Sequence, residues 1–285
     1  MYGTTVFAVS LFARVLVENP QLFKWSLLFK AFPGLIVMIL GNSLYSGINQ
    51  IYDADIDRVN KPYLPIPAGN LSLKQAWFLM TFYLLASLLI LWLMNADLIT
   101  TSIYCLTLLL DFFYSAPPIR FKKSPIATSM VNSVSGGILR VNGVLYATRA
   151  SLGIPFQWSL STVFISAFLT SFTVVIYNMK DLADVEGDIM HNIRTFPTIY
   201  GPRNTTFFCT GILLVNCIGA MVLAFSNPQA FKPYIMVPFH AHMALWVLLE
   251  VRKLDKANYT KEESAKFYQF LWKFISLELF VYPFI

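Results

Sequence analysis

The chain has 285 residues and a net charge of +6, and 56% of its residues are hydrophobic while only 13% are charged. Soluble domains carry about 25% charged residues, so this composition and a mean hydropathy of +0.60 exclude an ordinary soluble enzyme. We predict an all-α, polytopic membrane protein. The three cysteines and three histidines show no metal-ligand spacing, and we expect structural or solvated roles for His191, His240 and His242.

Nine apolar segments follow one another along the chain, and most have the ~20 residues that a helix needs to cross a bilayer. They are residues 3–17, 25–50, 73–93, 98–114, 127–147, 160–179, 205–225, 233–251 and 268–284. We predict nine transmembrane helices in a single domain over residues 1–285. The first segment is short and lacks the flanks of a signal peptide, so we expect the chain to begin inside its first helix, with an upstream stretch removed or never included.

An acidic motif follows the second apolar segment. Asn49, Asp53 and Asp57 are spaced i, i+4 and i+8, so a helix carries all three on one side. Two carboxylates one turn apart repel each other unless a cation lies between them. Because charge is costly at the end of a membrane helix, its presence here predicts a functional site.

A second acidic motif, residues 180–188, follows the sixth apolar segment, and its Asp181, Asp184 and Asp188 again share one helical face. The five aspartates of the two motifs would repel an anionic substrate unless divalent cations offset their charge. Carboxylate oxygens combined with substrate phosphates suit Mg²⁺, and such an ion neutralises the charge on a departing diphosphate. The two motifs therefore predict a Mg²⁺-dependent diphosphate site.

Alternation across the membrane places the connections after the second, fourth, sixth and eighth segments on one side. These connections hold both acidic motifs, the basic loop at residues 120–123 and most of the 21 lysines and arginines. The positive-inside rule assigns this side to the cytoplasm, or to the stroma in a plastid. The basic loop is placed to complete a diphosphate cradle. Behind it, an apolar bundle with 25 Phe and 14 Tyr offers space for an isoprenoid tail and ring faces that stabilise an allylic cation.

These motifs carry a family resemblance. Asn49-Gln50-x-x-Asp53-x-x-x-Asp57 and Lys180-Asp181-x-x-Asp184-x-x-Gly187-Asp188 resemble the paired aspartate motifs of the UbiA superfamily of membrane prenyltransferases. Further stretches resemble its plant and algal homogentisate branch, and within that branch the solanesyl-transferring members. These stretches are residues 47–53, 60–66, 114–118, 147–149, 155–158, 184–188 and 256–262. The similarity extends over nearly the whole chain.

The resemblance implies a UbiA-type bundle of nine helices that transfers a solanesyl group from its diphosphate to homogentisate. It also implies loss of the homogentisate carboxylate, a role in plastoquinone biosynthesis, and a plastid membrane, in particular the envelope, with the active site facing the stroma. The Mg²⁺ ligands and catalytic residues would be Asp53, Asp57, Asp181, Asp184 and Asp188. The substrate-binding residues would be Asn49, Gln50, Lys61, Tyr114, Arg120, Lys122 and Lys180. Membrane lipid is expected as a partner, and nucleic acid is not.

Two positions depart from the family pattern. Gly136-Gly137 stands where relatives usually have Arg-Gly, and Arg140, one turn further on, could return the charge to the same face. Ala183 stands where relatives usually have Pro. We expect both departures to tune the substrate pocket and not the metal site.

Three other functions remain as alternatives. Transfer of a phytyl or geranylgeranyl group to homogentisate is the nearest, although residues 65–69 favour solanesyl. Prenylation of flavonoids or coumarins is the second. An ion-coupled transporter is the third, but transporter carboxylates cluster near the bilayer midplane at broken helices, whereas these aspartates lie at segment ends beside basic loops.

Overall fold

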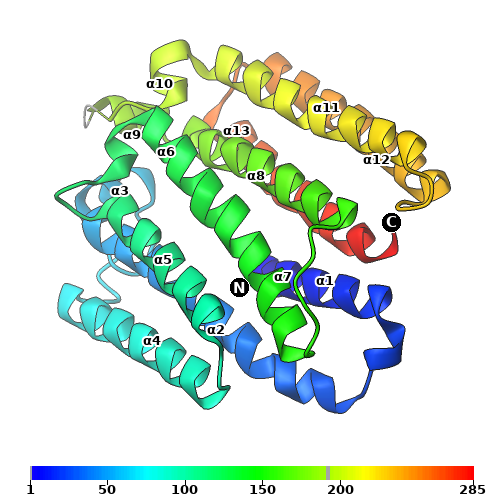
Figure 1. Ribbon diagram of the computed structural model, residues 1–285. Coiled ribbons are helices and arrows are strands. Elements are labelled where there is room, and N and C mark those ends of the chain that lie inside the picture. The colour runs from blue at the N-terminus through cyan, green and yellow to red at the C-terminus, as the bar shows by residue number, and fades with distance from the viewer. Residues whose placement is uncertain (1, 191–192) are drawn as a thin grey trace. The chain divides into compact units, whose positions relative to one another are not determined.

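The computed structural model describes residues 2–190 and 193–285, and every regular element within them is helical (Figure 1). The predicted all-α class is therefore confirmed. The chain divides into two compact units, which are Met1–Lys122 with Gly143–Phe156, and Lys123–Asn142 with Gln157–Ile285. The border between them passes through α7 (Arg140–Ser151). The single domain predicted for residues 1–285 stays a prediction.

The first unit is organised around its longest helix, α2, which packs against α1, α4 and α5. Its elements are α1 (Tyr2–Glu18), η1 (Pro20–Leu22), α2 (Ser26–Tyr52), α3 (Ala54–Asn60), α4 (Leu73–Leu93) and α5 (Leu98–Ser115). Gly47 of α2 allows the close approach of α4, because a Cβ there would lie 2.2 Å from Met80 Sδ. Side chains also define the helix starts: Ser72 caps α4 in a capping box, and Asp97 caps α5 by accepting from Thr100 N at 2.7 Å.

The second unit is organised around α8, which packs against α6, η3, α11 and α13 (Figure 1). Buried residues make up 61% of the most apolar stretch of α8, against 11% for α2, so α8 is a central helix. Phe168 and Phe172 of this helix stack on Phe274 with ring centroids 6.4 and 6.1 Å apart. The helices are α6 (Pro125–Asn132), α8 (Leu160–Lys180), α9 (Val185–Met190), α10 (Phe196–Tyr200), α11 (Pro202–Ser226), α12 (Pro233–Lys256) and α13 (Lys261–Val281). Three short turns complete the unit, namely η3 (Ser133–Leu139), η4 (Asp181–Ala183) and η5 (Tyr282–Phe284).

The fifth predicted segment, residues 127–147, is not one regular helix. It is divided into α6, the π-helical η3 and α7. Gly137 explains how η3 can lie so close to α8, because a Cβ at this position would lie 2.5 Å from the backbone Cα of Thr170. The glycine pair that departs from the family pattern is thus part of a helix contact.

Six helices are long and apolar enough to cross a membrane, and they correspond to α2, α4, α5, α8, α11 and α12. The other three predicted spans lie on helical residues, but their helices are too short or too polar to count as membrane spans. With 17 residues, α1 is short, and residues 127–147 are divided as described above. Charge distinguishes α13, which carries Lys266, Lys273 and Glu278. Among the described residues, the predicted count of nine spans is therefore not confirmed.

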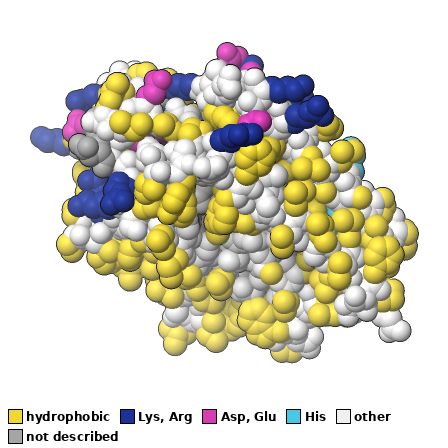
Figure 2. Space-filling view, turned by 90° about the horizontal axis from the view of Figure 1, so that it is seen from above, with side chains coloured by type: hydrophobic (Ala, Val, Ile, Leu, Met, Phe, Trp, Pro, Cys, Tyr) yellow, Lys and Arg dark blue, Asp and Glu magenta, His cyan; other side chains and the backbone are white. Residues whose placement is uncertain are grey.

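Large apolar side chains cover much of the outer surface, as the face in Figure 2 shows. On α4, Phe78 and Trp92 are exposed, and on α11 the same holds for Val215 and Phe225. A monomer in water rarely exposes wide apolar patches, whereas lipid tails are as apolar as these side chains. The exposed rows on α4 and α11 therefore support a position within a bilayer.

We expect Gly137→Ala to lower the free energy of unfolding by about 1–3 kcal/mol, because the new methyl group would overlap the α8 backbone. Thermal unfolding of the detergent-purified protein measures this change. Gly211→Ala in α11 is the matched control, since a Cβ there meets no atom within 4 Å. Equal melting temperatures for the two variants would show that the close η3–α8 contact is wrong.

Candidate functional site

The first acidic motif lies where α2 ends at Tyr52 and α3 begins at Ala54. Asp53 stands between the two helices with φ −107° and ψ 8°, yet the helical hydrogen bonds continue through it. Asp53 N donates to Asn49 O at 2.9 Å, and Asp57 N donates to Asp53 O at 2.8 Å. Asn49, Asp53 and Asp57 therefore lie on one side, and Asn49 Nδ2 donates to Asp53 Oδ2 at 2.8 Å.

Two basic side chains reach the carboxylate of Asp53. Lys122 Nζ contacts Asp53 Oδ1, and Arg120 Nη2 lies 3.4 Å from the same oxygen. Arg120 has a left-handed backbone with φ 47°, and its N–H donates to Ala116 O at 2.9 Å. The loop after α5 therefore turns back onto the first motif. Lysine and arginine beside a carboxylate create a place where an anionic group can bind once the carboxylate is neutralised.

The other predicted substrate residues of the first unit lie on α2 and α5 or directly after α3. Asn49 Nδ2 also lies 3.0 Å from Ser115 Oγ, which joins α2 to α5. The neighbouring Tyr114 is buried, and its ring centroid lies 5.9 Å from that of Tyr45. Gln50 is half-buried on the last turn of α2. Lys61 ends α3, where its N–H donates to Asp57 O at 2.7 Å.

The second acidic motif has the same local construction. Lys180 is the last residue of α8, and its Nζ lies 5.2 Å from the centre of the Tyr177 ring. Asp181 begins the short turn η4, and Asp184 stands between η4 and α9 with φ −103° and ψ 0°. Asp188 N then donates to Asp184 O at 2.9 Å. The regular helix is thus interrupted at Asp184, and a helical hydrogen bond from Asp188 continues it in α9.

The two motifs correspond residue by residue. Both contain an aspartate at the helix junction, an acidic residue two positions later, and a second aspartate four positions later. Asp53 and Asp184 share the bridge region of backbone space, where many active-site residues lie. The second aspartates, Asp57 and Asp188, are each 6% exposed. The sequence contains this repeated Asp-x-acidic-x-Asp pattern. Comparing aspartates alone misses it, because the middle acidic residue is Asp55 in one motif and Glu186 in the other.

The residue types of the motifs fit Mg²⁺. This ion binds to one or two carboxylates and completes its shell with waters and substrate phosphates, so neither motif needs a full cage of protein ligands. Among the residues that the structure describes, no group of three or more His, Cys, Asp or Glu side chains is arranged to hold a metal ion alone. Since the first motif belongs to the first unit and the second motif to the second, a cluster of all five aspartates stays a prediction.

One buried polar pair was not expected from the sequence. His240 Nε2 of α12 lies 3.1 Å from Glu278 Oε2 of α13, and both side chains are fully buried. His240 Nδ1 is 2.7 Å from Met236 O, so each ring nitrogen faces an oxygen. The sequence feature that could have indicated this pair was Glu278, a carboxylate inside the apolar segment 268–284. These contacts fit the structural role expected for His240, and His191 lies outside the described residues.

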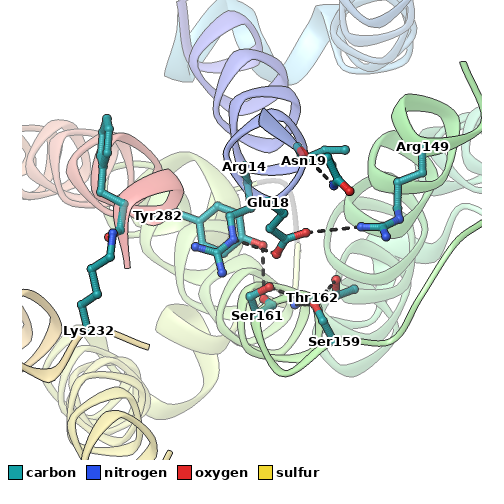
Figure 3. A network of polar contacts seen from close by, with 11 residues as sticks. Arg14, Glu18, Asn19, Arg149, Ser159, Ser161, Thr162, Lys232 and Tyr282 are labelled. Atoms are coloured by element: carbon teal, nitrogen blue, oxygen red, sulfur yellow. Dashed lines mark hydrogen bonds and ion pairs between the residues drawn. The ribbon is translucent and has the colours of Figure 1, made fainter. Parts of the chain in front are cut away.

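Two stretches of the family resemblance have a structural explanation. Glu18 at the end of α1 receives Arg14 Nε at 2.9 Å and Arg149 Nη1 at 3.3 Å (Figure 3). Arg149 Nε also donates to Pro155 O at 2.9 Å. Residues 147–149 and 155–158 thus include an ion-paired tie within the first unit between α1, α7 and the loop that follows α7.

The stretch at residues 256–262 forms the connection between α12 and α13. Asn258 and Tyr259 both have left-handed backbones, with φ 49° and 57°. Tyr259 Oη donates to Asp255 Oδ1 at 2.9 Å, and Arg203 Nε lies 3.1 Å from the same oxygen. Burial, and then the hydrogen bond to Asp255, raise the pKa of Tyr259. This connection is an ordered structural element.

The chain is similar over almost its whole length to several plant prenyltransferases. A model of the UbiA prenyltransferase family matches residues 6–274. A probable homogentisate phytyltransferase 2 of Oryza sativa is 45% identical over 99% of this chain and 74% of its own length. The homogentisate solanesyltransferase of Arabidopsis thaliana is 46% identical over 99% of this chain and 73% of its own. A 2-acyl-4-prenylphloroglucinol 6-prenyltransferase of Humulus lupulus is 42% identical over 99% and 69%.

Solved structures show the same fold at much lower identity. A UbiA homolog from Archaeoglobus fulgidus bound to GPP and Mg²⁺ matches with a TM-score of 0.68 at 17% identity, over 99% of this chain and 95% of its own. The apo structure of a UbiA homolog from Aeropyrum pernix matches with a TM-score of 0.68 at 16% identity, over 98% and 97%. On the family match and the plant relatives, the chain belongs to the UbiA prenyltransferase family.

Proposed function

We propose that the chain transfers a prenyl group from its diphosphate to homogentisate. The observation that carries this proposal is the repeated Asp-x-acidic-x-Asp motif at two helix junctions, the first of which is contacted by Lys122 and Arg120. Carboxylates beside cations suit a metal-bound diphosphate. Two plant relatives, each covering 99% of this chain, are named for homogentisate as acceptor, which supports the same acceptor here.

In this proposal the acidic, basic and apolar residues have different roles. The five aspartates would hold Mg²⁺, which when bound would supply positive charge to the departing diphosphate. Arg120 and Lys122 bind diphosphate oxygens through charge-assisted hydrogen bonds. Asn49 orients the Asp53 carboxylate through its contact at 2.8 Å, and Ser115 holds the Asn49 amide in turn. The apolar helices exclude water, which would otherwise capture the allylic cation.

We further propose a long-chain donor such as solanesyl diphosphate. Burying a methylene group is worth about 0.8 kcal/mol, but the membrane offers the tail an equally apolar medium. Selectivity for chain length should therefore be modest and set by the isoprene units nearest the diphosphate. Residues 65–69 favour solanesyl over phytyl, whereas 45% identity to the rice phytyltransferase and 46% to the Arabidopsis solanesyltransferase do not separate the two donors. Loss of the homogentisate carboxylate, a plastid membrane and a site on the stromal face belong to the same proposal.

We expect prenyl transfer to require a divalent cation and to fall on the order of 10²-fold or more in Asp53→Asn and Asp184→Asn, because each loses a charged oxygen ligand. Initial rates in membranes with and without chelator measure both effects. Asp55→Asn is the matched control. It lies in α3, two residues after Asp53, but its side chain is 88% exposed and pairs with Arg58 at 3.1 Å. Full activity in excess chelator would contradict the proposed metal site.

We expect homogentisate to be the preferred acceptor when donor concentration is matched, and solanesyl, geranylgeranyl and farnesyl diphosphates all to react. A site that hydrogen-bonds a substrate hydroxyl rejects an analogue without it by about 10⁴-fold or more, so acceptor choice should be sharper than donor choice. Product analysis by mass spectrometry with homogentisate, a 2-acylphloroglucinol, a flavonoid and a coumarin decides this. Faster turnover of the acylphloroglucinol would keep an aromatic prenyltransferase but replace homogentisate as the acceptor.

A further inference from the structure

Two neighbouring polar atoms in the second unit are buried without a hydrogen-bond partner among the described residues. They are Asn132 Oδ1 and Ser133 Oγ, and Asn132 as a whole is only 1% exposed. Buried polar atoms in native proteins are nearly always paired, so such a pair requires an explanation. The remaining buried atoms of this kind belong to His240 and Glu278, which lie 3.1 Å from each other and so face a polar group.

The orphaned atom of Asn132 is a hydrogen-bond acceptor. Asn132 Nδ2 donates to Thr128 O at 2.8 Å on the preceding turn of α6. Turning the amide over would place Oδ1 against that carbonyl oxygen, so that two acceptors would repel each other. The orientation is therefore set by the backbone, and Oδ1 is left facing away from it. A ligand that satisfies this atom must bring an O–H or N–H donor.

Helix contacts within the second unit relate the position of Asn132 to the second acidic motif. Asn178 Nδ2 donates to Ser129 Oγ at 3.2 Å, which joins α8 to α6. Further along, Gly137 lies against Thr170, so the two helices run in opposite directions. Asn178 precedes Asp181 by three residues, and Asn132 follows Ser129 by three. Each step is about 4.5 Å along a helix axis, and on antiparallel helices the two steps lead apart, so Asn132 is offset from Asp181 by about 9 Å along the axis, toward Gly137.

The local backbone also marks this position. The π-helical η3 begins at Ser133, directly after Asn132. π-helical turns are rare and occur frequently at functional sites. Gly137 holds this turn against α8, because any side chain there would meet the Thr170 backbone. The two orphaned atoms thus lie at the start of a turn whose position is set by close packing.

The chemistry of the two substrates decides which one can satisfy these atoms. A prenyl tail has no donor, and an ionised diphosphate offers only acceptor oxygens. The aromatic acceptor alone carries hydroxyl groups that donate. We propose that Asn132 Oδ1 accepts a hydrogen bond from a ring hydroxyl of the phenolic acceptor, and that Ser133 Oγ forms a second hydrogen bond to the same ring substituent. This assignment rests on the proposed function and identifies acceptor-specificity residues for it.

The test combines variants with acceptor analogues. Equilibrium binding of homogentisate is measured on the purified chain, together with 2-hydroxyphenylacetate and 3-hydroxyphenylacetate, each of which lacks one ring hydroxyl. In wild type, one of the analogues should bind about tenfold or more weakly than homogentisate. In Asn132→Leu, homogentisate should weaken by a similar factor, and the difference between it and that analogue should disappear. The KM for the prenyl diphosphate should not change.

Two further variants test the role of Ser133 and control for general effects of an Asn→Leu substitution. Ser133→Ala removes only one oxygen and introduces a strong helix former, so it should fold and weaken homogentisate binding several-fold. Asn142→Leu is the matched control, because both ends of that amide are paired: Nδ2 donates to Ile138 O at 2.8 Å and Oδ1 accepts from Ser166 Oγ at 3.0 Å. It should leave acceptor affinity and the analogue difference unchanged.

The possible failures are distinguishable. If wild type transfers the prenyl group and Asn132→Leu and Ser133→Ala keep wild-type affinity for all three acids, a buried water satisfies the two atoms and the inference is overturned. If wild type binds homogentisate but prenylates no phenol, the proposed function fails. The equilibrium binding of the three acids to wild type and Asn132→Leu still decides the role of Asn132. If wild type binds none of the three acids, the inference is overturned as well.

Discussion

Charge and hydrogen-bonding groups inside an apolar helical protein must find partners within the protein, because lipid supplies none. The chain meets this requirement in three places. Asp53 receives Lys122 and Arg120, Glu18 receives Arg14 and Arg149, and the fully buried Glu278 lies beside His240. The same physical rule therefore underlies a candidate reaction site, a tie between helices and a paired core residue.

The three places differ in what the pairing can do. A buried pair such as His240 with Glu278 leaves an uncompensated polar group if either partner is removed, which suits a structural role. Asp53 is different, because two cations share one of its oxygens while an amide holds the other. Excess positive charge beside a carboxylate is suited to an anionic substrate, provided that a metal takes over part of the carboxylate. We therefore expect substrate binding at Asp53, where two cations face a single carboxylate.

Close helix packing provides the second constraint. Gly47 admits Met80 against α2, and Gly137 admits the Thr170 backbone against η3. Such contacts give membrane helices van der Waals attraction that lipid cannot replace. At η3 the packing has a further consequence, because it holds Asn132 and Ser133 where Asn132 Oδ1 and Ser133 Oγ meet no hydrogen-bond partner in the part of the chain that the structure describes. The same turn therefore both packs closely against α8 and carries the two polar atoms that we propose bind the phenolic acceptor.

Much of the fold follows from local sequence. Hydropathy summed along the chain locates the apolar helices, and the spacing of Asn49, Asp53 and Asp57 is sufficient to place them on one side of a helix. The family resemblance also follows from short motifs, and the family match over residues 6–274 confirms it. The division of residues 127–147 at a π-helical turn was missed, because hydropathy does not distinguish one hydrogen-bond register from another.

What the sequence determined by itself was the helical membrane class, the two acidic motifs and the basic loop, since each depends on residues close together in the chain. Only the tertiary structure decided which distant residues meet. Lys122 reaches Asp53 across 69 positions, His240 meets Glu278 from the next helix, and Asn132 Oδ1 has no hydrogen-bond partner among the described residues. The physical reason is that a pattern along the chain records what each helix exposes, whereas packing between helices decides which groups are paired and which remain available to a substrate.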